Sequence, residues 1–298
     1  MSKKRKLKRT PGDIIADVFI GLFLGLFVFS AIYPFWHVLM YSISDSQAAM
    51  SGGLFFYPRN FSLLAYKMLF RTKMIFTAYK NTVLKTLVGT SISVVLTALT
   101  AYPLSLERFK GRNFISMMIF LTMLFSGGII PTFLVVKSLG LLDTFWAYVI
   151  PNAMSAYNMF ILRNYFQSIP RSLEESALID GANPFVTLTK IIIPVSLPSI
   201  AAITMFYGVS NWNSYMDGVL YVNDSKLQLL QVYLLKLINS TGAKGALGEA
   251  SDIGEASKIT EETMKMVTIS VSIIPVLIVY PFLQKYYVKG VMVGSVKG

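Results

Sequence analysis

One strongly apolar segment of the chain, residues 199–222, also carries polar and aromatic side chains at helical spacing. Because residues three or four positions apart share one face of an α-helix, the spacing predicts a stripe along this segment, made of Tyr207, Asn211, Ser214 and Tyr215. Amides and hydroxyls hydrogen-bond the OH groups of a sugar, and aromatic rings pack against the C–H side of a sugar ring. The stripe therefore offers the chemistry of a pathway for a polyhydroxylated solute.

The polar residues of this segment have a second interpretation. An amide near the middle of a membrane span cannot face lipid, where its unmet hydrogen bonds would cost several kcal/mol. Asn211 and Ser214 must then face protein or water, and hydrogen bonds to neighbouring helices would contribute about 0.6–2 kcal/mol each. We favour a pathway over helix packing, and the preceding apolar segment adds further candidates for it, Asn152, Tyr157 and Asn158.

A second stretch, residues 172–198, has the signals of two short helices joined by a tight turn. Ser172 and Glu175 have the spacing of a capping box at the start of the first helix. Gly181 stands where that helix must stop, because glycine adopts the left-handed conformation without a steric cost. The dipeptide Asn183–Pro184 then restarts a helix as N-cap and first helical residue.

The same stretch resembles the EAA loop of ABC importer permeases, which runs Glu-Ala-Ala, three residues, Gly, nine residues, Ile-x-Leu-Pro. The matching positions are Glu175, Ala177, Gly181, Ile191 and Pro194, and we expect Pro194 to end the second helix. Ser176 replaces one alanine of the motif and Ile193 its leucine. The motif is most similar to that of the carbohydrate-importer branch, of the maltose-permease G-subunit type. Without this resemblance, the stretch would be read as an amphipathic loop that merely connects two spans.

Composition indicates a polytopic, all-α membrane protein. The chain has 298 residues, of which 54% are hydrophobic, and its mean hydropathy is +0.58. Its net charge of +12 does not indicate nucleic-acid binding, because lysine and arginine gather in short segments beside apolar spans. The absence of cysteine excludes disulfides and thiolate metal sites. His37 is the single histidine, which removes most zinc and hydrolase chemistries.

A membrane span needs about 20 apolar helical residues, and the sequence predicts six such spans at about 14–40, 81–106, 114–137, 144–162, 199–222 and 264–287. Ser126-Gly127-Gly128 and Pro131 predict a break inside the third span. The cations flanking the spans place both termini on the cytoplasmic side. The predicted organisation is a cytoplasmic basic segment, residues 1–13, and one permease domain, residues 14–298. Within this domain the EAA loop, 163–198, is expected on the cytoplasmic side, and two loops, 42–80 and 223–262, on the outer side.

Several chemistries have no motif in this chain. There is no Gly-x-x-x-x-Gly-Lys-[Ser/Thr] phosphate cradle, no His-Glu-x-x-His and no Gly-x-Ser-x-Gly. We therefore expect a non-enzymatic chain that binds no cofactor or metal directly. An ion-coupled secondary transporter is the main rival, and Asp217 is the one ionisable residue that we place clearly within a span. An ABC permease for a non-sugar solute is the other alternative.

The resemblance implies a six-span type I ABC importer permease in the bacterial inner or plasma membrane. Its partners would be a second homologous permease, two ATPase subunits that use ATP and Mg²⁺, and an extracytoplasmic sugar-binding protein. The EAA loop would dock on an ATPase and couple its closure to passage of a carbohydrate, an oligosaccharide in this branch. The expected coupling residues are Glu174, Glu175, Ala177, Asp180, Gly181, Ala182 and Pro194.

Overall fold

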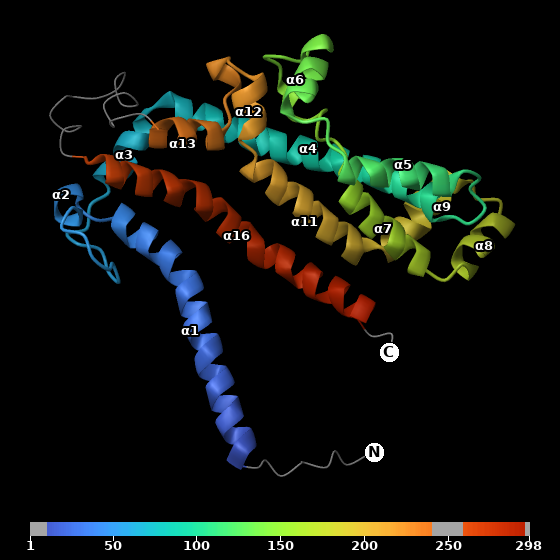
Figure 1. Cartoon of the computed structure of the whole chain (residues 1–298), viewed down its shortest axis with the longest axis horizontal. Coiled ribbons are helices and arrows are strands. Elements are labelled where there is room, and N and C mark those ends of the chain that lie inside the picture. Colours follow the sequence, from blue (N-terminus) through green and yellow to red (C-terminus); the bar gives the residue numbers. More distant parts are fainter. Residues whose placement is uncertain (1–10, 240–258, 296–298) are drawn as a thin grey trace. The chain divides into compact units, whose positions relative to one another are not determined.

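The computed structural model describes residues 11–239 and 259–295 (Figure 1). Most of the predicted basic segment 1–13 and the middle of the predicted outer loop 223–262 lie outside the described residues. Apart from an isolated bridge between Ser44 and Phe61, the regular elements of the described residues are helical. The chain divides into two compact units, the first made of residues 1–71 and 240–271 and the second of residues 72–239 and 272–298.

The first unit contains one long helix and a small capped loop region. Its helices are α1 (Pro11–Ser42), α2 (Ser46–Ala49), α3 (Leu64–Arg71) and the beginning of α16 (Glu261–Ser295). The apolar window of α1 is exposed along its whole length, as expected for a surface that faces lipid or another membrane helix. Asp45 caps α2, because its carboxylate accepts hydrogen bonds from the backbone N–H groups of Gln47 and Ala48, each at 3.1 Å.

The second unit holds most of the chain, including every predicted coupling and pathway residue. Besides the remainder of α16, its elements are α4 (Lys73–Ser105), α5 (Arg112–Leu124), α6 (Ile129–Ser138), the 3-10 turn η1 (Phe145–Tyr148), α7 (Ala156–Ser168), α8 (Ser172–Ile179), α9 (Pro184–Thr187), the π-helical turn η2 (Leu188–Ile192), α10 (Ile193–Val195), α11 (Leu197–Asn213), α12 (Met216–Tyr221), the 3-10 turn η3 (Ser225–Leu227) and α13 (Leu230–Asn239).

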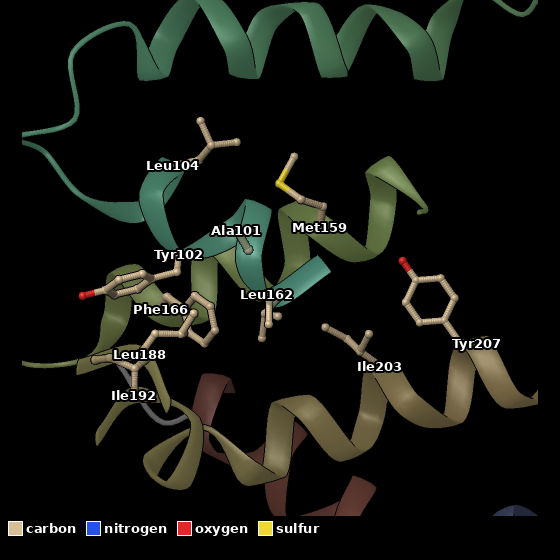
Figure 2. Packing of buried hydrophobic residues seen from close by; sticks show 11 residues of the cluster. Ala101, Tyr102, Leu104, Met159, Leu162, Phe166, Leu188, Ile192, Ile203 and Tyr207 are labelled. Atoms are coloured by element: carbon tan, nitrogen blue, oxygen red, sulfur yellow. The ribbon is translucent and has the colours of Figure 1, made fainter. Parts of the chain in front are cut away.

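Helix α4 is the centre of this unit, because α7 and α11 pack along it. Its buried face carries small and hydroxyl-bearing residues about one turn apart, including Gly89, Ser93, Thr97 and Ala101. Small side chains let the backbones of membrane helices approach closely, which strengthens van der Waals contact. Towards the C-terminal end of α4, large apolar side chains of α4, α7 and α11 meet in one core (Figure 2), which includes Leu104, Met159, Leu162, Phe166 and Ile203.

Two helices of the described residues, α1 and α4, are each long and apolar enough to cross a membrane. Two bent pairs would serve as broken spans: α5 with α6, bent by 117°, and Pro184–Val195 with α11, bent by 87°. The predicted break in the third span is confirmed, because α5 ends at Leu124 and α6 begins at Ile129, after Gly128 with φ of 88°. The number of six spans stays a prediction.

The structure differs from the sequence prediction in two other segments. Residues 144–162 do not form one continuous helix, because an irregular stretch separates η1 from α7, which begins at Ala156. Pro151 lies in this stretch, where its ring disfavours helical conformation of the preceding residue. In residues 199–222 the helix stops at Asn213, and Ser214 is extended, with φ of −68° and ψ of 124°.

The predicted stripe on the fifth span therefore does not lie on one helix face. Ser214 and Tyr215 belong to the break between α11 and α12, while Tyr207 and Asn211 lie on α11. The physical reason is local: the hydroxyl of Ser214 donates a hydrogen bond of 2.6 Å to the carboxylate of Asp217. Serine side chains that bond nearby groups in this way compete with the helical backbone pattern.

Close packing of α12 against α13 gives a test of the fold. A Cβ atom on Gly218 would lie 2.5 Å from Cγ2 of Val232, a stiff, buried side chain. Gly218→Ala is therefore expected to destabilise the protein by about 1–3 kcal/mol through overpacking. The measurement is the midpoint of thermal unfolding of the detergent-purified protein. Gly208→Ala is the matched control, because its Cβ would meet nothing closer than Thr90 Oγ1 at 4.0 Å. Equal midpoints for the two variants would contradict the packing described.

Candidate functional site

Helices α8 and α9 form a helical hairpin whose turn is as predicted. Gly181 has φ of 79°, the left-handed region that favours glycine. The N–H of Gly181 donates to the carbonyl of Leu178 at 3.0 Å, and the N–H of Ala182 donates to that of Ala177 at 2.9 Å. These two bonds form a Schellman motif that closes α8. The side chain of Asn183 then caps α9 by accepting a bond of 2.9 Å from the N–H of Val186.

The two ends of the hairpin differ from the prediction. Ser172 is the first helical residue rather than the N-cap, because the N–H groups of Glu174 and Glu175 both bond the carbonyl of Arg171. The helix thus begins one residue earlier, and the capping box does not form. At the other end Pro194 lies inside α10, and the chain bends only after Val195. Residues Pro184–Val195 form one helix, and Pro194 follows directly on its π-helical turn η2, where the regular α-helical hydrogen-bond pattern is already interrupted.

Charged residues attach the hairpin to the loop between α4 and α5. Arg108 Nη2 lies 2.6 Å from Glu174 Oε1, and the hydroxyl of Tyr102 donates to the same oxygen at 3.3 Å. Arg171 pairs with Glu107, and this hydrogen bond holds the pKa of the Glu107 carboxyl below its ordinary value. Both members of the second pair are exposed, so water screens it and it contributes little stability. The attachment therefore depends mainly on Glu174.

Apolar side chains of the hairpin remain exposed. Ile179 is 86% exposed and Phe185 is 64% exposed. Phe185 and Leu178 also line a cavity of about 520 Å³ beside the end of α4. Exposed apolar surface of this kind is typical of a contact with a partner protein. The predicted coupling residues divide accordingly: Ala177 is buried, Glu174 and Ala182 are half-buried, and the exposed ones are Glu175, Asp180, Gly181 and Pro194.

A polar cluster lies at the break between α11 and α12, and Asp217 is its common acceptor. Lys85 Nζ on α4 lies 3.0 Å from Asp217 Oδ2, which also accepts the 2.6 Å bond from the hydroxyl of Ser214. Asn152 Nδ2 donates to the other oxygen, Oδ1, at 3.1 Å. The side chain of Lys85 is fully buried, whereas that of Asp217 is 14% exposed. The ammonium also lies 5.3 Å from the centre of the Tyr148 ring.

Lys85 is the residue of this cluster that the sequence analysis missed. It lies within the predicted second span, 81–106, and so meets the rule that an ionisable residue inside a span marks a functional site. That rule alone would have identified it. Its pairing with Asp217 was not accessible, because the two residues are 132 positions apart in the chain.

Other predicted pathway residues connect helices to one another. The hydroxyl of Tyr207 lies 2.7 Å from Thr97 Oγ1 and accepts a bond of 2.9 Å from the N–H of Ser155, at the start of α7. Asn211 Nδ2 donates to Thr90 Oγ1 at 3.3 Å. These contacts join α11 to α4 and α7, and they agree with the packing interpretation of Tyr207 and Asn211.

The remaining pathway candidates differ in exposure. Asn158 is buried in α7, whereas Tyr157 is 60% exposed and Tyr215 is 44% exposed. Asn152 is exposed as well, and the structure brings it together with Ser214 on the carboxylate of Asp217.

Comparison with known proteins gives the family. Residues 74–293 match the family described as "Binding-protein-dependent transport system inner membrane component". The chain is 46% identical to the polygalacturonan/rhamnogalacturonan transport system permease protein YtcP of Bacillus subtilis, over 95% of this chain and 98% of that protein. It is 38% identical to Protein LplC of Bacillus subtilis over the full length of both.

A solved structure supports the same family over nearly the whole chain. It is the crystal structure of a bacterial ABC transporter involved in the import of the acidic polysaccharide alginate. One of its chains superposes with a TM-score of 0.88 and 35% identity, covering 95% of this chain and 100% of that chain. The fold is thus that of an ABC importer permease, and the chain belongs to the family of inner membrane components of binding-protein-dependent transport systems.

Proposed function

We propose that this chain forms the membrane pathway of an ATP-driven importer for a carboxylated oligosaccharide. The observation that carries the proposal is the near full-length similarity to YtcP and to a chain of the alginate transporter. Polygalacturonan and alginate are both polymers of sugar acids, which supports an acidic oligosaccharide as the substrate. Within its family the chain is a non-catalytic, multi-pass inner membrane subunit, and ATP hydrolysis takes place in separate subunits.

The proposed assembly contains a second homologous permease, two ATPase subunits and an extracytoplasmic sugar-binding protein. ATP and Mg²⁺ belong to the ATPases, and this chain holds neither. The described residues contain no group of three His, Cys, Asp or Glu side chains that could hold a metal ion. The proposed spans are α1, α4, α5 with α6, the segment from η1 to α7, α11 with α12, and α16. Clustering of cations beside them supports cytoplasmic termini and a cytoplasmic hairpin.

In the proposed mechanism the α8–α9 hairpin is a lever between the ATPase and the spans. One end continues through η2 and α10 into the 87° bend that begins α11. The other side is attached to the loop after α4 through Arg108 and Glu174. A displacement of the hairpin is therefore transmitted to α4 and α11 together. Closure of the ATPases would then shift the population between two packed states that open to opposite sides.

The proposed sugar pathway passes the Asp217 cluster. Asn152 and Ser214 supply polar groups there, and the exposed rings of Tyr157 and Tyr215 supply aromatic faces. Tyr207 and Asn211 hold α11 on α4 and on the start of α7, and Asn158 is buried in α7. The family match and the near full-length similarity to ABC importer permeases support ATP-driven rather than ion-coupled transport.

The substrate proposal is tested by deleting the gene for this chain in its host. Uptake of galacturonate or alginate oligosaccharides is expected to be lost and to return when the gene is restored. Uptake of a neutral maltooligosaccharide and of an amino acid serves as the control and should not change. Loss confined to the neutral sugar would contradict the carboxylated class, and unchanged uptake of every oligosaccharide would contradict carbohydrate import.

The proposed topology is tested by labelling single cysteines in a chain that has none of its own. Gln47 and Ser172 are both exposed in the structure. In intact cells, an impermeant thiol reagent is expected to label Gln47→Cys and to leave Ser172→Cys unlabelled. After permeabilisation both should react, which controls for accessibility. Labelling of Ser172→Cys in intact cells would reverse the orientation.

The lever is tested by Gly181→Val. A β-branched residue at φ of 79° costs about 1–3 kcal/mol and distorts the turn. Uptake by the assembled importer is expected to fall several-fold, while the ATPases still hydrolyse ATP.

Gly140→Val is the matched control for this variant. Gly140 has φ of 67° and, like Gly181, no neighbouring atom within 4 Å of the position that a Cβ would occupy. The control therefore carries the same conformational strain outside the hairpin. Equal loss of uptake in both variants would mean that strain, rather than coupling, causes the effect.

A further inference from the structure

We propose that Lys85 and Asp217 form an ion pair that positions Asn152 and Ser214 to accept hydrogen bonds from the hydroxyl groups of the sugar. This inference rests on the proposed function, since it takes a sugar as the ligand. Lys85 and Asp217 are therefore positioning residues, and Asn152 and Ser214 are the groups that touch the substrate.

The burial of Lys85 indicates that the pair has a role beyond packing. Its side chain is fully buried in α4, a helix apolar enough to span a membrane, and its ammonium lies 3.0 Å from Asp217 Oδ2. A charge inside a span is costly and persists where it has a partner. A buried ion pair, however, is often no more stabilising than apolar residues of the same volume. Holding α12 against α4 therefore does not by itself require charged residues.

The ion pair fixes which hydrogen-bonding groups its two neighbours, Asn152 and Ser214, can present to a ligand. An ionised carboxylate only accepts, so Asn152 must turn its Nδ2 towards Asp217 Oδ1. The carbonyl oxygen of Asn152 and one of its N–H bonds are then left for a ligand. Ser214 uses its single proton on Asp217 Oδ2, which leaves its oxygen as an acceptor. The pair thus orients both side chains so that they present mainly acceptors, which match the O–H donors of a sugar.

The backbone around the cluster supports the same location. Ser214 lies in the break after α11, and Asn152 lies in the irregular stretch between η1 and α7. Irregular backbone inside a membrane protein is tolerated where it is buried in protein or lines a water-filled cavity. Asn152 is exposed and Ser214 is partly exposed, so both present polar groups at the surface of this chain. Three separate elements thus meet at one carboxylate beside accessible polar groups.

The test removes both charges together, so that no unpaired charge is left in the membrane. In Lys85→Met/Asp217→Leu the importer is expected to assemble and hydrolyse ATP as the wild type does. Its KM for uptake should rise about tenfold, the effect of losing two ordinary hydrogen bonds, with kcat changed much less. Lys80→Met, which removes an exposed cation from the same helix, is the matched control and should keep the wild-type KM.

A wild-type KM in the double variant would show that the pair only packs helices, and it would overturn the proposal. A second measurement covers the case in which the double variant does not assemble. Asn152→Ala and Ser214→Ala leave the ion pair intact, and each is expected to raise the KM several-fold in an importer that assembles and hydrolyses ATP. A wild-type KM in both variants would overturn the proposal. All KM values are measured with an oligosaccharide that the wild-type importer is first shown to transport. A failure of the carboxylated-substrate proposal is therefore detected before the ion pair is tested.

Discussion

The constraint on which this structure depends is that a membrane-embedded chain must satisfy its own polar groups. Helices meet it for the backbone, and every interruption needs side chains that replace the lost bonds. At the break after α11, Ser214, Asn152 and Lys85 all converge on Asp217. The same carboxylate therefore both closes the break and gathers accessible polar groups at one point of the proposed pathway.

Helix α11 joins the two proposed functional regions of the second unit, the hairpin and the Asp217 cluster. It begins at the 87° bend that follows the hairpin and ends at the break beside Asp217. Its 17 residues span about 25 Å, a large part of a bilayer's thickness. The bond of Asn211 to Thr90 and the contacts of Tyr207 hold this helix on α4. A rigid element between the hairpin and the proposed pathway is what the proposed transmission of movement requires.

The two sets of charges in the second unit have different physical roles. Arg171 and Glu107 are both more than half exposed, so their pair is screened and easily exchanged for contacts with another protein. Lys85 is fully buried, and breaking its pair would leave an uncompensated charge on a side chain with no exposed surface. The exposed pair suits a hairpin that moves in the proposed mechanism, whereas the buried pair suits a permanent part of the proposed pathway wall.

The sequence by itself determined the features that depend on neighbouring residues. The all-helical membrane class follows from composition, the turn at Gly181 and the cap at Asn183 from side-chain and backbone chemistry within a few positions, and the break before Ile129 from glycine and proline. Only the tertiary structure decided which polar residues share a site. Tyr207 and Asn211 connect helices, whereas Asn152 and Ser214 meet at Asp217, which also binds Lys85. Local spacing cannot reveal this, because the partners come from distant elements whose packing alone brings their side chains together.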